Sequence, residues 1–176
     1  IVREGTSIRT VVEEEAFQEC SQLKSVVLGE GVTEVRRWSF RFCSNLEKVV
    51  LPHSLQTIGA AAFADTFDYY GSPELMTFLE TDGNSNYYIG DWLITGSDSS
   101  MIRAGTRGIA DDAMNCGCVP DLPEGIEYIG EKACGSILPW SIPASVKFIG
   151  SYAFGEPYVW YSFGATGQCH IRMRMG

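Results

Sequence analysis

A phrase of the form Ala/Ser-Phe-x-x-Cys-x-x-Leu recurs along this chain at a fixed interval. Its phenylalanines, Phe17, Phe40 and Phe63, stand 23 residues apart, and Cys20 and Cys43 keep the same interval. Self-similarity with a period of about 20 to 50 residues is typical of stacked repeat architectures. The repeat therefore constrains the fold more than any other feature, and it shifts the search for function from a pocket to a surface.

The pattern stops after Phe63 and returns with a shorter period. The equivalent residues Met114, Cys134 and Phe154 follow at intervals of 20 residues. The gap of 51 residues between Phe63 and Met114 predicts an insertion or one strongly altered repeat. We expect a single domain over 1–176, with regular repeats at about 1–66 and 106–157, an insert at about 67–105 and a C-terminal tail or cap at about 158–176.

Short β-branched runs predict two strands in each of the first full repeats. One run contains Val26 or Val49, and a second lies at 32–35 or 55–58, with later copies at 126–129 and 146–149. Strands of successive repeats would pair in parallel. The Ala-Phe-x-x-Cys stretch would form a helical or 3₁₀ turn. Since no repeat buries its own apolar face, about six coils would stack into one rod.

Glycine closes three of the repeats, at Gly59, Gly130 and Gly150. The equivalent positions elsewhere hold residues such as Arg36 and Ala110, so a positive φ is not required there. We interpret these glycines as allowing close stacking of one coil on the next.

The sequence resembles BspA-like, or Treponema-type, leucine-rich repeats. Residues 142–154 read Ile-Pro-x-x-Val-x-x-Ile-Gly-x-x-Ala-Phe, 46–63 is similar, and so are the Cys-x-x-Leu endings at 20–23 and 43–46. The resemblance implies an α/β repeat solenoid, a right-handed superhelix of short parallel strands and short helical or 3₁₀ turns, with a β-hairpin insert at 87–94. It also implies a secreted or surface-anchored protein of host-associated bacteria or some protists, without shared catalytic residues.

A second hairpin is predicted from the residues alone. The polar stretch 96–100 separates the apolar pairs 93–94 and 101–102, which is the pattern of two strands and their connecting loop. Loops that project from a rigid scaffold often carry recognition.

The charge balance disfavours two classes of partner. The chain holds 22 acidic residues against 13 Lys and Arg, a formal charge of −9. Nucleic acids and anionic membranes both need a basic surface, so we expect neither as a partner. No apolar run is long enough to span a membrane. The chain opens inside a repeat without a signal peptide, which we interpret as a mature or trimmed product.

The cysteines have a simple interpretation and an alternative one. Cys20 and Cys43 share a repeat position and are expected to be buried thiols. The alternative is a zinc site, but the paired Cys-x-x-Cys spacing typical of such sites is missing. Its ligands would be Cys116, Cys118, Cys134, Cys169 and His170. We predict no metal and no cofactor.

Other polar groups also lack a catalytic pattern. His53 stands next to Ser54, but adjacency in sequence does not orient a base toward a nucleophile. The acidic run 13–15 fits the solvated start of a helical turn, and 82–86 fits a turn. We therefore predict no catalytic residues.

Two surfaces remain candidates for ligand binding. On the strands of the first repeats, residues that alternate with the buried ones would face solvent, with Lys24 beside Glu47 and Ser25 beside Lys48. Aromatic residues in and near the insert would either cap the core or line a binding face. The candidate ligand-binding residues are Lys24, Ser25, Val27, Glu47, Lys48, Val50, Tyr69, Tyr70, Tyr87, Tyr88 and Trp92.

These features predict a non-catalytic binding or adhesion module that contacts protein or glycan ligands. The extracellular or cell-surface location is implied by the family resemblance. One alternative is a structural spacer within a larger surface protein. Another is a hydrolase, which would need a deep pocket with convergent polar groups.

Overall fold

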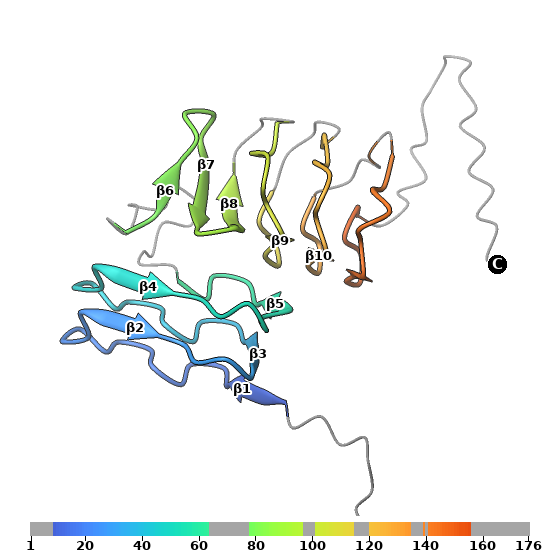
Figure 1. The fold of residues 1–176 in the computed structure, drawn as a ribbon. Coiled ribbons are helices and arrows are strands. Elements are labelled where there is room, and N and C mark those ends of the chain that lie inside the picture. The colour runs from blue at the N-terminus through green and yellow to red at the C-terminus, as the bar shows by residue number, and fades with distance from the viewer. Residues whose placement is uncertain are drawn as a thin grey trace, which may run out of the picture.

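The computed structural model describes residues 9–63, 78–96, 101–114, 120–134, 139 and 141–155. They form a β-solenoid arranged as two stacks of coils, here called the N-terminal array (9–63) and the C-terminal array (the described part of 78–155) (Figure 1). The strands of the two arrays stack along different directions in Figure 1. The expectation that all coils stack into one rod is therefore wrong.

Two small parallel sheets build the N-terminal array. One contains β1 (Thr10–Val12), β3 (Val32–Val35) and β5 (Thr57–Ile58) in that spatial order. The other pairs β2 (Ser25–Val27) with β4 (Lys48–Val50). The predicted parallel pairing of successive repeats is confirmed.

One mixed sheet builds the C-terminal array. Its parallel part contains β8 (Trp92–Gly96), β9 (Gly108–Ile109), β10 (Tyr128–Ile129) and β11 (Phe148–Ile149). The antiparallel part adds β7 (Asn86–Ile89) and β6 (Glu80–Thr81) on the far side of β8. Since β8 belongs to both parts, the second strand of the β7–β8 hairpin is also the first strand of the parallel stack.

The repeat register is visible as a column of rings. Phe17 and Phe40 have centroids 5.1 Å apart, and Phe40 and Phe63 are 5.2 Å apart, each pair within 2° of parallel. Phe63 meets Phe78 edge-on at 6.3 Å, where the ring stack ends. The predicted alignment of the three repeat phenylalanines is confirmed.

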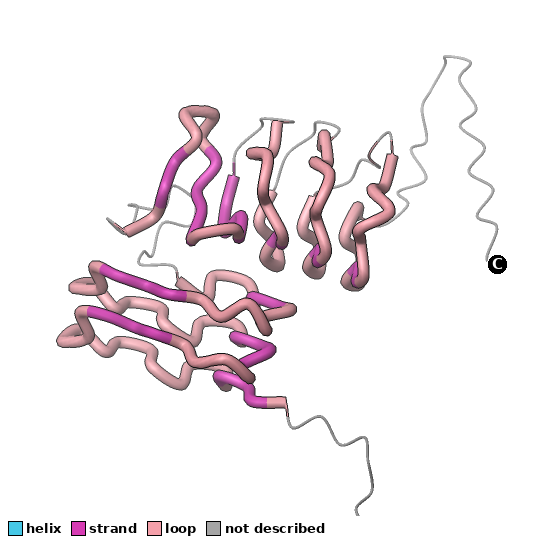
Figure 2. Tube along the Cα trace, in the orientation of Figure 1, coloured by secondary structure: helices cyan, strands magenta, loops and turns pink. Residues whose placement is uncertain are grey.

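No helix occurs among the described residues, and the repeated Ala/Ser-Phe segments are turns (Figure 2). The residue two positions before each column residue is left-handed, which is incompatible with a continuing right-handed helix. These residues are Glu15, Trp38, Ala61, Asp112, Lys132 and Tyr152, with φ between 51° and 58°. The N–H groups of these turns instead donate to carbonyls of the next coil. For example, the N–H of Phe40 donates to the carbonyl of Ala62 at 2.8 Å. The expected helical or 3₁₀ turns are therefore not confirmed.

The three repeat glycines allow close stacking, as predicted. None has a positive φ. A Cβ at Gly59 would lie 2.4 Å from the backbone nitrogen of Arg37, and one at Gly150 would lie 2.5 Å from that of Glu131. Because these atoms are backbone of the preceding coil, no side chain can move aside to make room.

The segment after β8 does not form the second predicted hairpin. Gly96 pairs in parallel with Met114, and Met101 pairs in parallel with Asp121. The described residues on either side of the stretch thus pair with later coils, while 97–100 and the tail after residue 155 lie outside the described residues. No helix in the described part is long and apolar enough to cross a membrane.

Candidate binding surfaces

Arg107 fastens the two arrays together. Its Nη1 donates to the carbonyl of Leu55 at 2.9 Å, its Nη2 donates to that of Pro52 at 3.5 Å, and its Nε pairs with Asp91 at 2.7 Å. Within the N-terminal array, the Ser54 hydroxyl donates to the carbonyl of Val32, the repeat equivalent of Leu55. The buried guanidinium of Arg107 therefore donates to the Leu55 carbonyl. In a longer N-terminal array, a side chain of the next coil would donate to this carbonyl instead.

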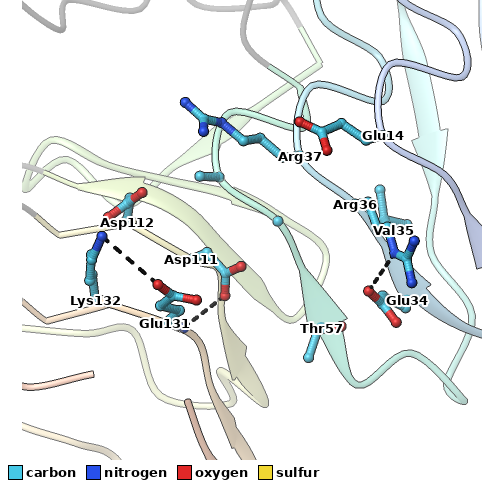
Figure 3. A pocket seen from close by; sticks show the side chains of 12 residues that line it. Glu14, Glu34, Val35, Arg36, Arg37, Thr57, Asp111, Asp112, Glu131 and Lys132 are labelled. Atoms are coloured by element: carbon cyan, nitrogen blue, oxygen red, sulfur yellow. Dashed lines mark hydrogen bonds and ion pairs between the residues drawn. The ribbon is translucent and has the colours of Figure 1, made fainter. Parts of the chain in front are cut away.

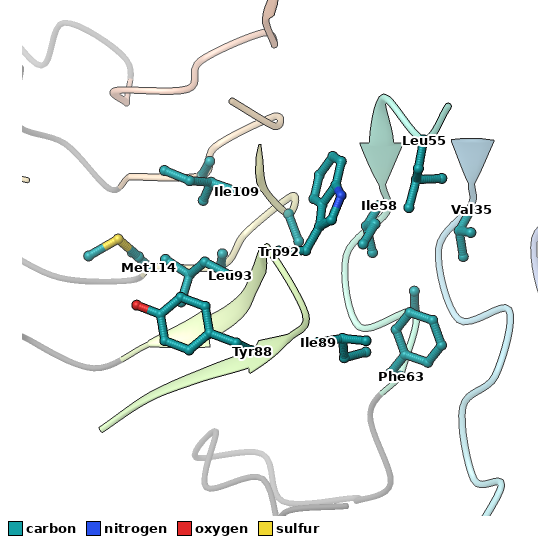
Figure 4. Close-up of a cluster of buried hydrophobic side chains, with 14 of the residues drawn as sticks. Val35, Leu55, Ile58, Phe63, Tyr88, Ile89, Trp92, Leu93, Ile109 and Met114 are labelled. Carbon is teal, nitrogen blue, oxygen red and sulfur yellow. The ribbon is translucent and has the colours of Figure 1, made fainter. Parts of the chain in front are cut away.

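Main-chain hydrogen bonds also cross this junction between the two arrays, which we call the joint. The N–H of Ala110 donates to the carbonyl of Leu93 at 2.9 Å, and the next N–H, from Asp111, donates to that of Ile58 at 2.9 Å. The end of β9 thus bonds to both arrays at once. Buried side chains of both arrays form one hydrophobic cluster here, with Trp92 between them (Figure 4).

The indole of Trp92 fits this cluster because its strand partner is a glycine. Trp92 pairs with Gly108 across β8 and β9, and a Cβ at Gly108 would lie 2.6 Å from the indole ring. Tyr128 stacks on the same indole, with centroids 6.2 Å apart.

A cleft of about 300 Å³ opens beside the joint, with walls from both arrays (Figure 3). Its charged lining residues are Glu14, Glu34, Arg36, Arg37, Asp111, Asp112, Glu131 and Lys132. Glu34 pairs with Arg36 at 2.9 Å, and Lys132 lies 3.8 Å from Glu131. The cleft is polar, and charges of both signs line it.

Asp111 is the perturbed group of this cleft. Burial raises its pKa to about 6, and the nearby charges of Glu131, Asp112 and Glu34 act in the same direction. The N–H of Glu131 opposes the rise by donating to its Oδ1 at 2.7 Å. A carboxyl group whose pKa is raised to about 6 thus lies at the junction of the two arrays.

The predicted strand face has the geometry expected of it. Ser25 pairs with Lys48 and Val27 with Val50 across β2 and β4. The next position is also aligned, because the N–H of Glu47 donates to the carbonyl of Lys24 at 2.9 Å. All six predicted residues of this face are exposed, and Val27 and Val50 remain 69% and 40% exposed.

The aromatic candidates lie elsewhere than predicted. Tyr88 and Trp92 are 0% exposed, so they do not line a surface, and that part of the prediction is corrected. Tyr88 is held inside the C-terminal array because its hydroxyl donates to Asp82 at 3.1 Å and accepts from the N–H of Arg103 at 3.0 Å. Tyr87 is half-buried, and 69–70 lies outside the described residues.

The cysteines divide into two groups. Cys43 and Cys134 are fully buried, as expected for apolar thiols, whereas Cys20 is exposed. The prediction for Cys20 is wrong because no described coil covers its outer side. The other proposed zinc ligands, at 116, 118, 169 and 170, lie outside the described residues. Within the described ranges, no three His, Cys, Asp or Glu side chains gather as a metal site.

His53 and Ser54 fasten neighbouring coils. Their N–H groups donate to the Glu30 carboxylate at 2.9 and 3.1 Å, which lowers the pKa of Glu30. The Ser54 hydroxyl also accepts from the N–H of Gly31 at 2.9 Å. In these contacts the pair bridges two coils and is not arranged as a base and nucleophile.

The family comparison bears on the N-terminal array. A family model described as the BspA type leucine rich repeat region (6 copies) matches residues 6–71. Residues 6–71 are thus similar to BspA-type leucine-rich repeats. Searches of curated proteins and of solved structures gave no match. The later coils lie beyond the matched BspA-type segment, but they share its left-handed turn residue and its parallel strand pairing.

Proposed function

We propose that this chain is a non-catalytic binding or adhesion module at a cell surface or in the extracellular space. The BspA-type repeats support a modular scaffold, and such solenoids present broad, shallow surfaces to their ligands. The proposed contact surface is the face of β2 and β4, here called the strand face, formed by Lys24, Ser25, Val27, Glu47, Lys48 and Val50.

The exposed pair of valines carries this proposal. Val27 and Val50 lie side by side in register, next to charged residues that include Lys24 and Lys48. An apolar centre with a polar rim is the usual anatomy of a protein contact. Tyr88 and Trp92 are buried, so neither offers a ring on which a glycan could stack. The apolar pair at the centre of the strand face therefore favours a protein ligand at this face.

The test is a binding screen with a matched pair of variants. The chain would be screened against panels of extracellular proteins and of glycans, and each hit would be measured by biolayer interferometry. Val27→Ser combined with Val50→Ser should weaken a true protein ligand at least about tenfold. Met101→Ser changes an apolar side chain that is 64% exposed in the other array, and it should leave binding unchanged.

Two results would contradict the proposal. The absence of any ligand in both panels would favour the structural spacer. A glycan hit that is insensitive to both valine substitutions would move the contact away from the strand face.

A hydrolase is the second candidate because of one observation. Asp111 has a pKa of about 6 in a cleft lined by further carboxylates, and a carboxyl group with a raised pKa can act as a general acid in mildly acidic solution. Release of product from a panel of polysaccharides or peptides, abolished by Asp111→Asn, would support this candidate. An inactive wild-type chain would count against it.

A further inference from the structure

The joint buries a polar group that has no hydrogen-bond partner in the described part of the chain. The Nε1–H of Trp92 is buried and finds no acceptor among the described residues. A buried donor without a partner destabilises the arrangement that buries it. Trp92 lies between Leu55 and Ile58 of one array and Leu93 of the other (Figure 4). Separating the arrays would let water reach this donor.

Charges face Asp111 from both sides of the joint. From the N-terminal array they are Glu14 on its first turn, Glu34 on β3, and Arg36 and Arg37 after it; from the C-terminal array they are Asp112, Glu131 and Lys132 (Figure 3). Arg36 is already engaged by Glu34 at 2.9 Å and by Glu13 at 2.5 Å. Burial is the main reason that the ionised form of Asp111 is disfavoured here, and repulsion from Glu34 across the joint adds to it, so ionisation of Asp111 favours separation of the arrays.

The same residue also helps to hold the joint closed. The N–H of Asp111 donates to the carbonyl of Ile58, one of the main-chain bonds between the arrays. Ionisation of the Asp111 side chain therefore places a negative charge next to a hydrogen bond that joins the two arrays.

We propose that the joint is a proton-controlled hinge, in which protonated Asp111 keeps the two arrays closed and ionised Asp111 lets them separate. This inference does not depend on the proposed ligand. It would place the separation of the two cleft walls under the control of pH.

The direction follows from the carboxyl group itself. In the closed form Asp111 keeps its proton up to about pH 6, whereas in a solvated open form its pKa returns toward 3.8. The ratio of open to closed molecules therefore rises as pH increases from near 4 and levels off above 6. The difference of about two pKa units allows at most about a hundredfold change in that ratio.

Hydrogen exchange of the intact chain tests the hinge. The amides of Ala110 and Asp111 report the joint, and the amide of Gly59, bonded to Val35 within the N-terminal array, reports the array interior. After correction for intrinsic exchange, protection at 110–111 should fall at least about tenfold between pH 4.5 and 7, while protection at Gly59 stays constant.

Three variants test whether ionisation of Asp111 causes the pH dependence of protection at 110–111. Asp111→Asn keeps an acceptor for the Glu131 N–H and should remove the pH dependence. Asp112→Asn neutralises the exposed neighbour and should leave the midpoint nearly unchanged. Glu34→Gln removes the charge across the joint and should move the midpoint to lower pH.

Small-angle scattering provides a second readout of the same variants. The wild-type radius of gyration should be larger at pH 7 than at pH 4.5, and that of the folded Asp111→Asn variant should not differ between these values. The proposal is overturned if the wild type shows constant protection at 110–111 and constant dimensions over this range. It is equally overturned if Asp111→Asn keeps the wild-type pH response.

Discussion

Phe40 is the buried member of the ring column, covered on both faces by Phe17 and Phe63. It is 1% exposed, whereas Phe17 is 43% exposed. Phe40→Ala should lower the free energy of unfolding by about 3–5 kcal/mol, because the rings above and below cannot close the cavity. Phe17→Ala should cost clearly less, since solvent already reaches that ring. Urea denaturation of the two variants measures the difference, and equal losses would show that the column is not the core of the array.

Asp111 allows a prediction about stability and pH. Its folded pKa, about 6, lies above its ordinary value of 3.8, so ionisation destabilises the fold as pH rises through this window. Asp111→Asn should therefore raise the stability at pH 7 by about 1–2 kcal/mol, a value reduced for partial exposure of the group. The gain should vanish near pH 3.5, where both folded and unfolded wild-type chains are protonated. Thermal unfolding across this range measures the gain, and a constant gain at every pH would contradict the assignment.

At the scale of the element, the stability of a coil depends on how closely its backbone packs against the backbone of the previous coil. Gly59→Ala should lower the free energy of unfolding by about 1–3 kcal/mol, because its Cβ would meet backbone atoms of Arg36 and Arg37. Gly29→Ala is the matched control, since nothing lies within 4 Å of its Cβ and its φ is not positive. Calorimetry should show a lowered Tm for the first and little change for the second. A similar Tm for both would mean that the coils separate to accept the methyl group.

At the scale of the whole molecule, Arg107 determines whether the two arrays unfold together. Arg107→Ala removes the donors to Pro52 and Leu55 and leaves Asp91 without its cation. Breaking a fully buried ion pair costs about 3–5 kcal/mol, and this pair should cost less because the Asp91 side chain is 42% exposed. We expect the thermal transition to broaden or split, because each array keeps its own ladders while their coupling is lost. Arg36→Ala, which removes an exposed cation, should preserve one transition. A single wild-type-like transition in Arg107→Ala would exclude this role.

The sequence predicts periodic features well and local conformations poorly. The ring column and the strand pairing follow from a spacing that Phe17, Phe40 and Phe63 repeat. The left-handed turn residues give no such signal, since Glu15 and Trp38 are not residue types that favour positive φ. Their conformation is set by hydrogen bonds to the next coil, which no local pattern contains.

The candidate site was predicted only in part for a related reason. Strand alternation places Val27 and Val50 outward, but it does not show that Tyr88 finds partners for its hydroxyl inside the array. The joint gives no local signal either, because Arg107 bonds a carbonyl 52 residues away in a different stack. The presence of two consecutive acidic residues at 111–112 is too common a pattern to indicate a cleft.

The joint also determines how this chain would respond to tension. Pulling between residues 9 and 155 would transmit force from one stack to the other through the bonds of Arg107 and Asp111 and the packing around Trp92. Within each stack, parallel ladders and a shared core join every coil to its neighbour. Under shear flow the molecule would therefore yield first at the seam between the stacks and lengthen there, while the coils on either side stay folded.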